Sequence, residues 1–570
     1  MPTIALGPEH RARSLARMAE ETFDVVVVGG GVVGCGAALD AATRGLSVAL
    51  LEARDYAAGT SSRSSKLIHG GLRYLEQLNV RLVREALRER TLLLDRLAPH
   101  LVRPVPFLFP LTHHGWERWY VGAGLLLYDT LGGSRGLPMH RHLTRREARR
   151  VAPSLRPDRL VGAVRYYDAQ VDDARHTLFL ARTAAAYGAA VATSLPAVGL
   201  LREGERVTGV RARDAETGAE LLVRARQVIN ATGVWTDDMQ EMVGGRGRLR
   251  VRASKGVHLV VPRDRIDLDT GLITRTEKSV LFVIPWGRHW IIGTTDTDWN
   301  LHKAHPAASR ADIDYLLRHV NDWLRSPLSM EDVEGVYAGL RPLLAGESEE
   351  TSRLSREHLV TAPLPGLVLV AGGKYTTYRV MAKDAVDEAA RHLDARHRIP
   401  PSVTDRIPLL GAEGYHALVN QRFDLAERSG LHVARVEHLL GRFGSCATEL
   451  LALVAERPDL GAPVPGADDY LLAEARYAAS HESARHLEDV LTRRTRISIE
   501  TWDRGLSAAE PVARVMAEVL GWSGEQTARE VEHYRLRVQA ERESQEQVDD
   551  TSADAARLGA PELFPRYPHD

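Results

Sequence analysis

Cysteine is almost absent from this chain of 570 residues, which contains only Cys35 and Cys446. Two cysteines cannot form the disulfide framework of a small secreted scaffold, and neither lies in a CxxC or other zinc-ligand spacing. We therefore expect no structural disulfide and no metal site. Scarce cysteine is typical of a protein that works in the reducing cytoplasm.

Long apolar runs and an excess of one charge are also missing. No stretch reaches the roughly 18 apolar residues that a membrane-spanning helix needs, and the first twenty residues are too charged for an export signal. The 74 basic and 75 acidic residues give a net charge of −1, which argues against nucleic acid as a partner. We expect a cytoplasmic protein whose only membrane contact is peripheral, on the inner face of the cell membrane.

Short apolar runs do occur, and they alternate with helical patterns. The runs at 24–28, 47–51, 227–230 and 367–370 are short and rich in apolar residues, as buried parallel strands are. Residues 256–335 contain strand-like runs typical of a mainly antiparallel sheet, and from about residue 400 apolar residues recur at helical spacing. The sequence thus predicts an α/β fold, α+β overall, with a helical C-terminal domain.

These patterns predict five parts, two of them discontinuous in sequence. The expected boundaries are 1–21 for an N-terminal helical extension; 22–110, 160–255 and 336–395 for a cofactor-binding domain; 111–159 and 256–335 for a substrate-binding cap; 400–540 for the helical domain; and 541–570 for a mobile tail.

A glycine-rich motif follows the first expected strand. Gly29, Gly31 and Gly34 form GxGxxG at the start of an expected helix, and Glu52 follows the next strand at 47–51. In such a unit the glycines allow a tight turn, close approach of a pyrophosphate and close helix packing, while the acidic residue accepts hydrogen bonds from a ribose. The segment therefore predicts a dinucleotide site.

Two later segments distinguish FAD from NAD. Ala231, Thr232 and Gly233 follow another buried strand and resemble the ATG motif of glutathione-reductase-type flavoproteins. A second glycine pair, which includes Gly373, stands before an expected helix. A plain NAD-binding domain needs neither segment, so we expect a Rossmann-like FAD-binding domain of the glutathione-reductase type.

The segment GTSSRSSKLIHGGLRYLE at 59–76 resembles the FAD-dependent glycerol-3-phosphate dehydrogenases of the D-amino-acid-oxidase-like superfamily. The similarity covers roughly 22–525. It includes YYDAQVDDAR at 166–175, IIGTTDTD at 291–298, YAGLRPL at 337–343, GGKYTTYR at 372–379 and, in the helical domain, LLGRFGSCATEL at 439–450 and EARYAASHESARHLEDVLTRRTRI at 474–497.

This resemblance implies oxidation of sn-glycerol 3-phosphate to dihydroxyacetone phosphate by hydride transfer to FAD, with electrons passed to a quinone or another acceptor. Such a reaction needs phosphate ligands, a proton acceptor and positive charge beside the flavin. The candidates for the substrate phosphate are Arg341, Arg356, Arg73 and Tyr74. The candidate base is His258, with Lys374 and Thr376 stabilising negative charge and also contacting substrate. Ser64, Ser65 and Gly71 are expected to contact the flavin.

One aromatic segment is a candidate membrane surface. Trp116, Trp119 and Tyr120 precede an apolar run at 121–127, and five arginines follow at 141–150. Such a combination suits an anionic lipid surface, but a helix packed in the core would have the same pattern.

Three alternative functions stay open at this level. The chain could be a glycerol-3-phosphate oxidase that uses oxygen, an amine or amino-acid oxidase of the same superfamily, or a flavin-binding regulator without turnover. Homodimerisation is equally undecided, because no residue pattern addresses it.

Overall fold

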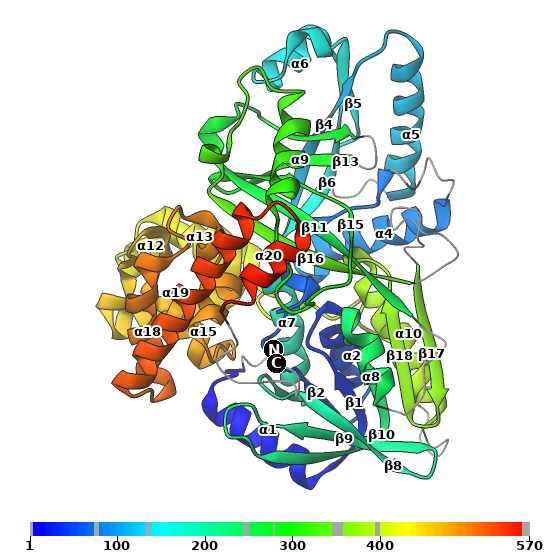
Figure 1. The fold of residues 1–570 in the computed structure, drawn as a ribbon, viewed down its shortest axis with the longest axis vertical. Coiled ribbons are helices and arrows are strands. Elements are labelled where there is room, and N and C mark those ends of the chain that lie inside the picture. Colours follow the sequence, from blue (N-terminus) through cyan, green and yellow to red (C-terminus); the bar gives the residue numbers. More distant parts are fainter. Residues whose placement is uncertain are drawn as a thin grey trace.

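The computed structural model describes residues 4–72, 74, 79–132, 137–242, 250–276, 280–344, 357–393 and 399–560. Figure 1 shows one sheet with its helices at the lower end of the molecule, a second sheet at the upper end, and a helical domain at the side. The expected fold class is confirmed.

The first sheet has a parallel centre assembled from distant segments. Its order is β18 (Leu367–Gly372), β10 (Glu220–Asn230), β1 (Thr22–Val28), β2 (Val48–Leu51) and β7 (Ala190–Ala192). The antiparallel strands β17 (His358–Leu364), β9 (Arg206–Arg213) and β8 (Ala197–Glu203) extend it.

Alternating residues of β1 explain why its apolar run has no polar face. Val25 and Val27 belong to a core that includes α2 (Val32–Thr43), α7 (Asp173–Ala186) and α10 (Tyr378–Arg391), whereas Val26 and Val28 belong to the core on the opposite face. Successive side chains of a strand point to opposite sides, so a strand buried on both faces must be apolar throughout. The four predicted strands are confirmed as β1, β2, β10 and β18, with β1 paired to β2 and β10 and with β10 paired to β18.

Within the described ranges the second sheet has ten strands and is mainly antiparallel, as expected. Among its described pairs only β4 with β12 is parallel. Its strands are β3 (Leu67–Ile68), β4 (Val102–Leu111), β5 (Arg141–Thr144), β6 (Gly162–Val171), β11 (Val251–Pro262), β12 (Gly271–Arg275), β13 (Val280–Trp286), β14 (His289–Gly293), β15 (Thr297–Trp299) and β16 (Gly335–Leu344).

Sheet membership does not follow the predicted domain boundaries. β3, β4, β6 and β16 pair in the second sheet, although most of their residues were assigned to the cofactor-binding domain. The difference has a physical cause: periodicity identifies a strand, but its partner is set by non-local contacts such as the full-length pairing of β4 with β6. The helices α5 (Trp116–Gly132), α6 (Arg145–Val151) and α9 (Arg310–Asn321) lie with this sheet (Figure 1).

The C-terminal region is helical and includes α13 (Val433–Phe443), α15 (Leu472–His481), α18 (Leu506–Leu520), α19 (Gly524–Glu546) and α20 (Asp550–Arg557). The mobile tail predicted from residue 541 is therefore wrong as far as residue 560. This segment has few large apolar groups, and it is ordered instead by polar contacts and a buried alanine, Ala553. Residues 561–570 lie outside the described part of the chain.

The N-terminal helix α1 (Pro8–Glu20) is where the sequence predicts it. Arg11 on this helix is buried and forms an ion pair with Asp214, with 2.6 Å between Nη2 and Oδ1, and it also donates to the carbonyl of Thr193. Because both contacts are made with the first sheet region, the helix is part of the folded unit.

Buried arginines attach the helical domain to the two sheets. Arg493 and Arg494 both bind the carboxylate of Asp55 at 2.6 Å, and Arg496 binds Asp172 and Asp173 at 2.5 and 2.6 Å. Burial alone would raise the pKa of Asp55, but the guanidinium groups of Arg494 and Arg493 hold it below its usual range. Asp55 is therefore ionised and links the two parts of the molecule.

We predict that Asp55→Ala destabilises the protein by about 3–5 kcal/mol, since it leaves two buried guanidinium groups without their carboxylate. Urea unfolding followed by tryptophan fluorescence measures the effect. Asp459→Ala is the matched control, because it removes a solvent-exposed pair with Arg457 and should leave the midpoint unchanged. Equal midpoints for both variants would show that the Asp55 contacts do not stabilise the fold.

Candidate active site

A central cavity of about 1050 Å³ lies where the carboxyl ends of β1, β2, β10 and β18 meet the second sheet. Ligands of open parallel sheets bind at these strand ends. The volume exceeds the roughly 300–1,000 Å³ of pockets for drug-sized ligands, so the cavity has room for an extended dinucleotide.

The glycine loop forms one wall of this cavity. Gly29 has φ of +110°, and a Cβ there would lie 2.6 Å from the carbonyl oxygen of Ala231. A Cβ on Gly34 would collide with the carbonyl of Gly29, so this glycine serves helix packing and does not itself line the cavity. Gly31 does line it, directly before the first residue of the 12-residue helix α2, where helix N–H groups favour an anion.

Glu52 lies at the same end of the cavity. Its carboxylate accepts hydrogen bonds from the backbone N–H of Gly30 at 2.6 Å and of Arg54 at 2.8 Å. Burial raises the pKa of Glu52. The two backbone donors fix the orientation of the carboxylate, and its remaining lone pairs can accept hydrogen bonds from ribose hydroxyls. The glycine loop, the helix start and this acceptor together fit an FAD molecule.

His258 on β11 lies at the opposite end of the cavity from Glu52, where the second sheet forms the cavity wall. It is 2% exposed, its Nε2 lies 2.8 Å from the Ser65 hydroxyl, and its ring stacks on Tyr337 with centroids 4.7 Å apart. Burial, followed by the charges of Arg341 and Lys66, lowers the pKa of His258 well below its usual value. The imidazole is therefore neutral near pH 7 and is in the form that accepts a proton.

Arg341 is held on β16 by residues that follow β14. Its guanidinium donates to the hydroxyl of Thr294 at 3.0 Å and the carbonyl of Thr295 at 3.2 Å, and it lies 3.5 Å from the carboxylate of Asp296. The side chain stays 23% exposed and lines the cavity. These contacts fix the plane of the guanidinium, which suits binding of a second anion.

Lys374 and Thr376 lie before α10, after the glycine pair. The ammonium of Lys374 lies 3.3 Å from the centroid of the Tyr74 ring, a close cation–π contact. Thr376 accepts a hydrogen bond from the backbone N–H of His69 at 3.2 Å. Lys374, Tyr74 and Thr376 all line the cavity, so residues from distant parts of the sequence meet here.

The serine-rich segment is tied to a buried ion pair that the sequence analysis missed. Ser64 donates through its N–H and hydroxyl to Asp173, whose other oxygen pairs with Lys66 at 2.9 Å. Lys66 is fully buried, and its ammonium lies 5.0 Å from the centroid of Tyr337, the ring on which His258 stacks. The pair fixes the wall behind His258. Both residues lie in quoted family segments, but nothing in one sequence pairs them.

Most of the predicted site residues share this cavity. Those that line it are Gly29, Gly31, Glu52, Ser64, Ser65, Tyr74, Ala231, Thr232, Gly233, His258, Arg341, Gly373, Lys374 and Thr376. Gly71 lies next to it, because a Cβ on Gly71 would collide with the Tyr74 ring. Arg73 and Arg356 lie outside the described residues.

Two family models match the chain. The model for FAD dependent oxidoreductases (DAO) matches residues 24–387, and the model for the C-terminal domain of alpha-glycerophosphate oxidase matches residues 402–527.

Individual relatives cover nearly the whole chain. It is 61% identical over 561 residues to the glycerol-3-phosphate dehydrogenase of Mycobacterium leprae, and the alignment covers 98% of this chain and 96% of the relative. It is 36% identical over 537 residues to the human mitochondrial glycerol-3-phosphate dehydrogenase, and this alignment covers 90% of this chain and 73% of the human protein.

A solved structure has the same architecture. The glycerol-3-phosphate dehydrogenase from Bacillus halodurans complexed with FAD superposes with a TM-score of 0.77 at 28% identity, over 94% of this chain and 98% of that one. Matching sequence segments, two family models and a common fold agree, and we conclude that the chain belongs to the FAD-dependent glycerol-3-phosphate dehydrogenase family.

Proposed function

We propose that this protein oxidises the C2 hydroxyl of sn-glycerol 3-phosphate to give dihydroxyacetone phosphate, with FAD as the hydride acceptor and a quinone as the onward electron acceptor. The observation that carries the proposal is the presence of a fixed guanidinium, Arg341, and a neutral imidazole, His258, on one wall of a cavity that fits FAD. Membership of the family supports the same chemistry.

Residues at the two ends of the cavity would hold the cofactor. Gly29, Gly31 and the start of α2 suit its pyrophosphate, Glu52 suits the adenosine ribose, and Ser64, Ser65, Gly373 and Thr376 suit the ring end. Bound FAD supplies the two-electron acceptor that no amino-acid side chain provides.

The chain itself positions substrate and moves the proton. Arg341 neutralises the phosphate dianion and fixes its orientation through paired N–H donors. His258 accepts the hydroxyl proton as the C2 hydrogen departs, because its imidazole is neutral. Lys374, held over Tyr74, would add positive charge at the ring end of the cofactor site.

A substrate panel tests the assignment. With a soluble quinone analogue as acceptor, glycerol 3-phosphate should be oxidised rapidly, whereas glycerol, which lacks the phosphate, should be a poor substrate. Turnover of glycine or proline in place of glycerol 3-phosphate would indicate an amine or amino-acid oxidase. Bound flavin without turnover of any of these compounds would favour the regulator.

Quinone is proposed over oxygen because one end of the molecule is suited to a lipid surface. On α5 the residues Val121, Leu125 and Tyr128 pack inward, while the opposite side exposes Trp116 by 65%, Trp119 by 79% and Tyr120 by 52%. Only one face of α5 is therefore packed in the core, and the other face is free to contact a lipid surface. No helix in the described ranges is both long and apolar enough to cross a membrane.

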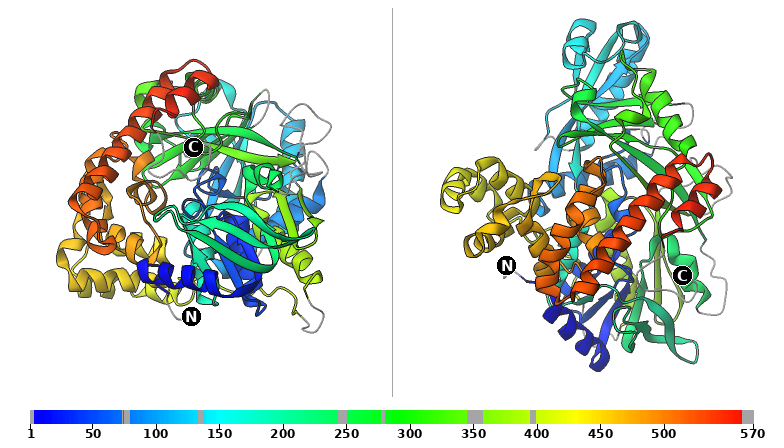
Figure 2. Two further views of the ribbon diagram at one scale, coloured as in Figure 1. Left: turned by 60° about the horizontal axis from the view of Figure 1, so that its bottom comes forward. Right: turned by 60° about the vertical axis from the view of Figure 1, so that its left-hand side comes forward.

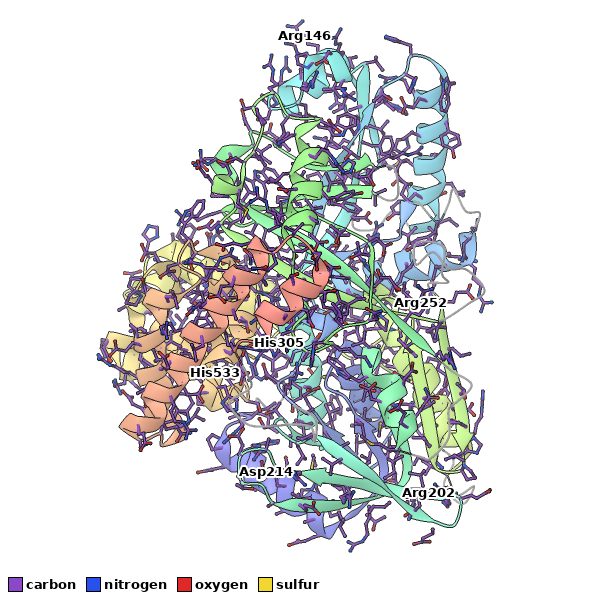
Figure 3. All side chains as sticks on the ribbon, viewed as in Figure 1. Arg146, Arg202, Asp214, Arg252, His305 and His533 are labelled. Carbon is purple, nitrogen blue, oxygen red and sulfur yellow. The ribbon has the colours of Figure 1, made fainter. Side chains whose placement is uncertain are left out.

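Positive charge lies at the same end of the molecule. Figure 3 shows Arg146 on α6 at the end opposite the first sheet, the end where α5 also lies. The exposed arginines here are Arg141, Arg145, Arg146, Arg149 and Arg150. Aromatic side chains beside arginines are the combination that binds an anionic leaflet.

Trp119→Glu should weaken binding to vesicles of phosphatidylglycerol and phosphatidylcholine by about tenfold, since an apolar anchor becomes a like charge. Co-sedimentation measures the bound fraction. Trp502→Glu is the control, because Trp502 is also exposed, by 51%, but lies in the helical domain. An equal loss of vesicle binding in the two variants would show that α5 is not part of the membrane-binding surface.

A further inference from the structure

The last two helices extend beyond both family models. The models end at residues 387 and 527, whereas α19 continues to Glu546 and α20 spans Asp550–Arg557. Figures 1 and 2 show α19 in the helical domain and α20 running on from it to the strands of the second sheet, and Asp554 of α20 lines the central cavity. Residues 528–557 therefore lie outside both family models, and neither model gives them a role at the central cavity.

Ion pairs fix the start of α20 on the second sheet. The carboxylate of Asp550 lies 2.5 Å from the ammonium of Lys255 on β11 and accepts a hydrogen bond from Ser309 at 3.0 Å. Lys255 is fully buried and also pairs with Asp312 at 2.5 Å. The backbone N–H of Arg310 donates to the carbonyl of Gln547 at 2.8 Å. A buried ammonium group needs carboxylate partners. Because Asp550 is one of the two partners of Lys255, the start of α20 is fixed on the second sheet.

The next turn of α20 supports the cavity wall. Ala553 is fully buried in an apolar cluster with Val234, Leu340 and Trp299, against which Trp235 and Leu301 pack. Of these, Val234, Trp235, Leu301 and Leu340 line the central cavity. A larger side chain at position 553 must displace them.

Asp554 forms part of the wall itself. It lines the cavity and is 5% exposed, with one carboxylate oxygen 3.5 Å from His302. The other oxygen, Oδ1, is buried and has no hydrogen-bond partner among the described residues. Burial raises the pKa of Asp554, and His302 opposes that shift. Because the Asp554 carboxyl group belongs to the lining of the cavity, it can accept a hydrogen bond from a donor on a bound ligand.

The segment at 300–304 connects this wall to the dinucleotide end. The guanidinium groups of Arg54 and Arg63 both donate to the carbonyl of Ala304, at 3.2 and 3.1 Å, and Lys303 pairs with Asp238 at 2.6 Å. Arg54 also donates its backbone N–H to Glu52, the proposed ribose ligand. Figure 3 shows His305, which follows this segment, beside α20. The segment is thus held from the first sheet on one side and by α20 on the other.

We propose that α20 is part of the cofactor site: it closes the adenosine end of the cavity, Asp554 accepts a hydrogen bond from a hydroxyl or amino group there, and the helix slows release of FAD. The inference rests on the proposed function, because it requires that the cavity holds FAD. Three observations support it: the ion pair of Asp550 with Lys255, the apolar cluster around Ala553, and the position of Asp554 in the cavity wall.

Release of FAD from full-length holoprotein provides the test. Each variant is purified with flavin and diluted, and the rise in free-flavin fluorescence gives the release rate. Ala553→Arg should release FAD about 10- to 100-fold faster than wild type, because an overpacked cluster displaces the wall. Asp554→Ala should release it about three- to tenfold faster, the effect of one lost hydrogen bond. Ala555→Arg, the same substitution on the exposed face of α20, should match wild type.

The outcomes separate this inference from the proposed function. Faster release from Ala553→Arg and Asp554→Ala than from Ala555→Arg supports α20 as part of the site. Equal release from all three overturns the inference and leaves the function standing, whereas a wild-type chain that binds no flavin overturns both. If Ala553→Arg does not fold, Asp554→Ala against Ala555→Arg decides, with the thermal midpoint of each apoprotein confirming that its fold is intact.

Discussion

Arg341→Ala should lower kcat/KM for glycerol 3-phosphate by about 10²- to 10³-fold, which corresponds to about 3–4 kcal/mol. The guanidinium is fixed by Thr294, Thr295 and Asp296, so its loss removes a preformed anion site and places the phosphate beside the carboxylate of Asp296. Steady-state kinetics with a quinone analogue measure the effect. Arg341→Lys should be intermediate, because it keeps the charge and loses the paired donors.

Arg252→Ala is the matched control. Arg252 lies on β11, the strand paired with β16, but its partner is Asp298 at 3.1 Å and it does not line the cavity (Figure 3). This variant should retain wild-type kinetics. Wild-type kcat/KM in Arg341→Ala, or equal losses in both variants, would remove Arg341 from the phosphate site.

His258→Asn should lower kcat by about 10²- to 10⁴-fold, the usual contribution of a positioned general base. Asparagine can still form a hydrogen bond with Ser65 but does not accept a proton at working pH. Single-turnover reduction of the bound flavin by substrate measures the affected step. His289→Asn is the control, since His289 lies on the adjacent strand β14, pairs with Glu334 at 3.0 Å and does not line the cavity.

The direction of the His258 pKa shift also predicts the pH dependence. Burial and the nearby cations Arg341 and Lys66 lower the pKa of His258 well below the ordinary histidine value of about 6.5. The neutral, proton-accepting form therefore persists from high pH down through pH 6.5, and the rate loss from its protonation begins only below that value. A wild-type acid limb centred above pH 6.5, or a kcat for His258→Asn within tenfold of wild type, would assign the base elsewhere.

Features encoded by neighbouring residues could be predicted from the sequence. The glycine loop, Glu52 and the apolar strand β1 lie within one short unit, where spacing alone fixes their relation. The antiparallel character of the second sheet follows from the strand pattern in the same way. For His258, Arg341 and Lys374, by contrast, the expectation depended on family resemblance, because no local pattern brings β11, β16 and the start of α10 together.

Features that depend on long-range pairing could not be predicted. The contact of Lys66 with Asp173 and the anchoring of Arg341 by residues 294–296 join segments far apart in the chain. The error about residues 541–560 has the same origin. Their composition is polar, and their order comes from Lys255 and Ser309, which lie about 240 or more positions earlier in the sequence. Composition describes a segment but not the surface against which it packs.

Anaerobic addition of sn-glycerol 3-phosphate to the purified holoprotein tests the central claim most directly, since it joins cofactor and substrate without any acceptor. We predict that the yellow absorbance of the oxidised flavin disappears with stoichiometric formation of dihydroxyacetone phosphate, and that glycerol at the same concentration leaves the spectrum unchanged. A flavin that stays oxidised in the presence of glycerol 3-phosphate would contradict the account.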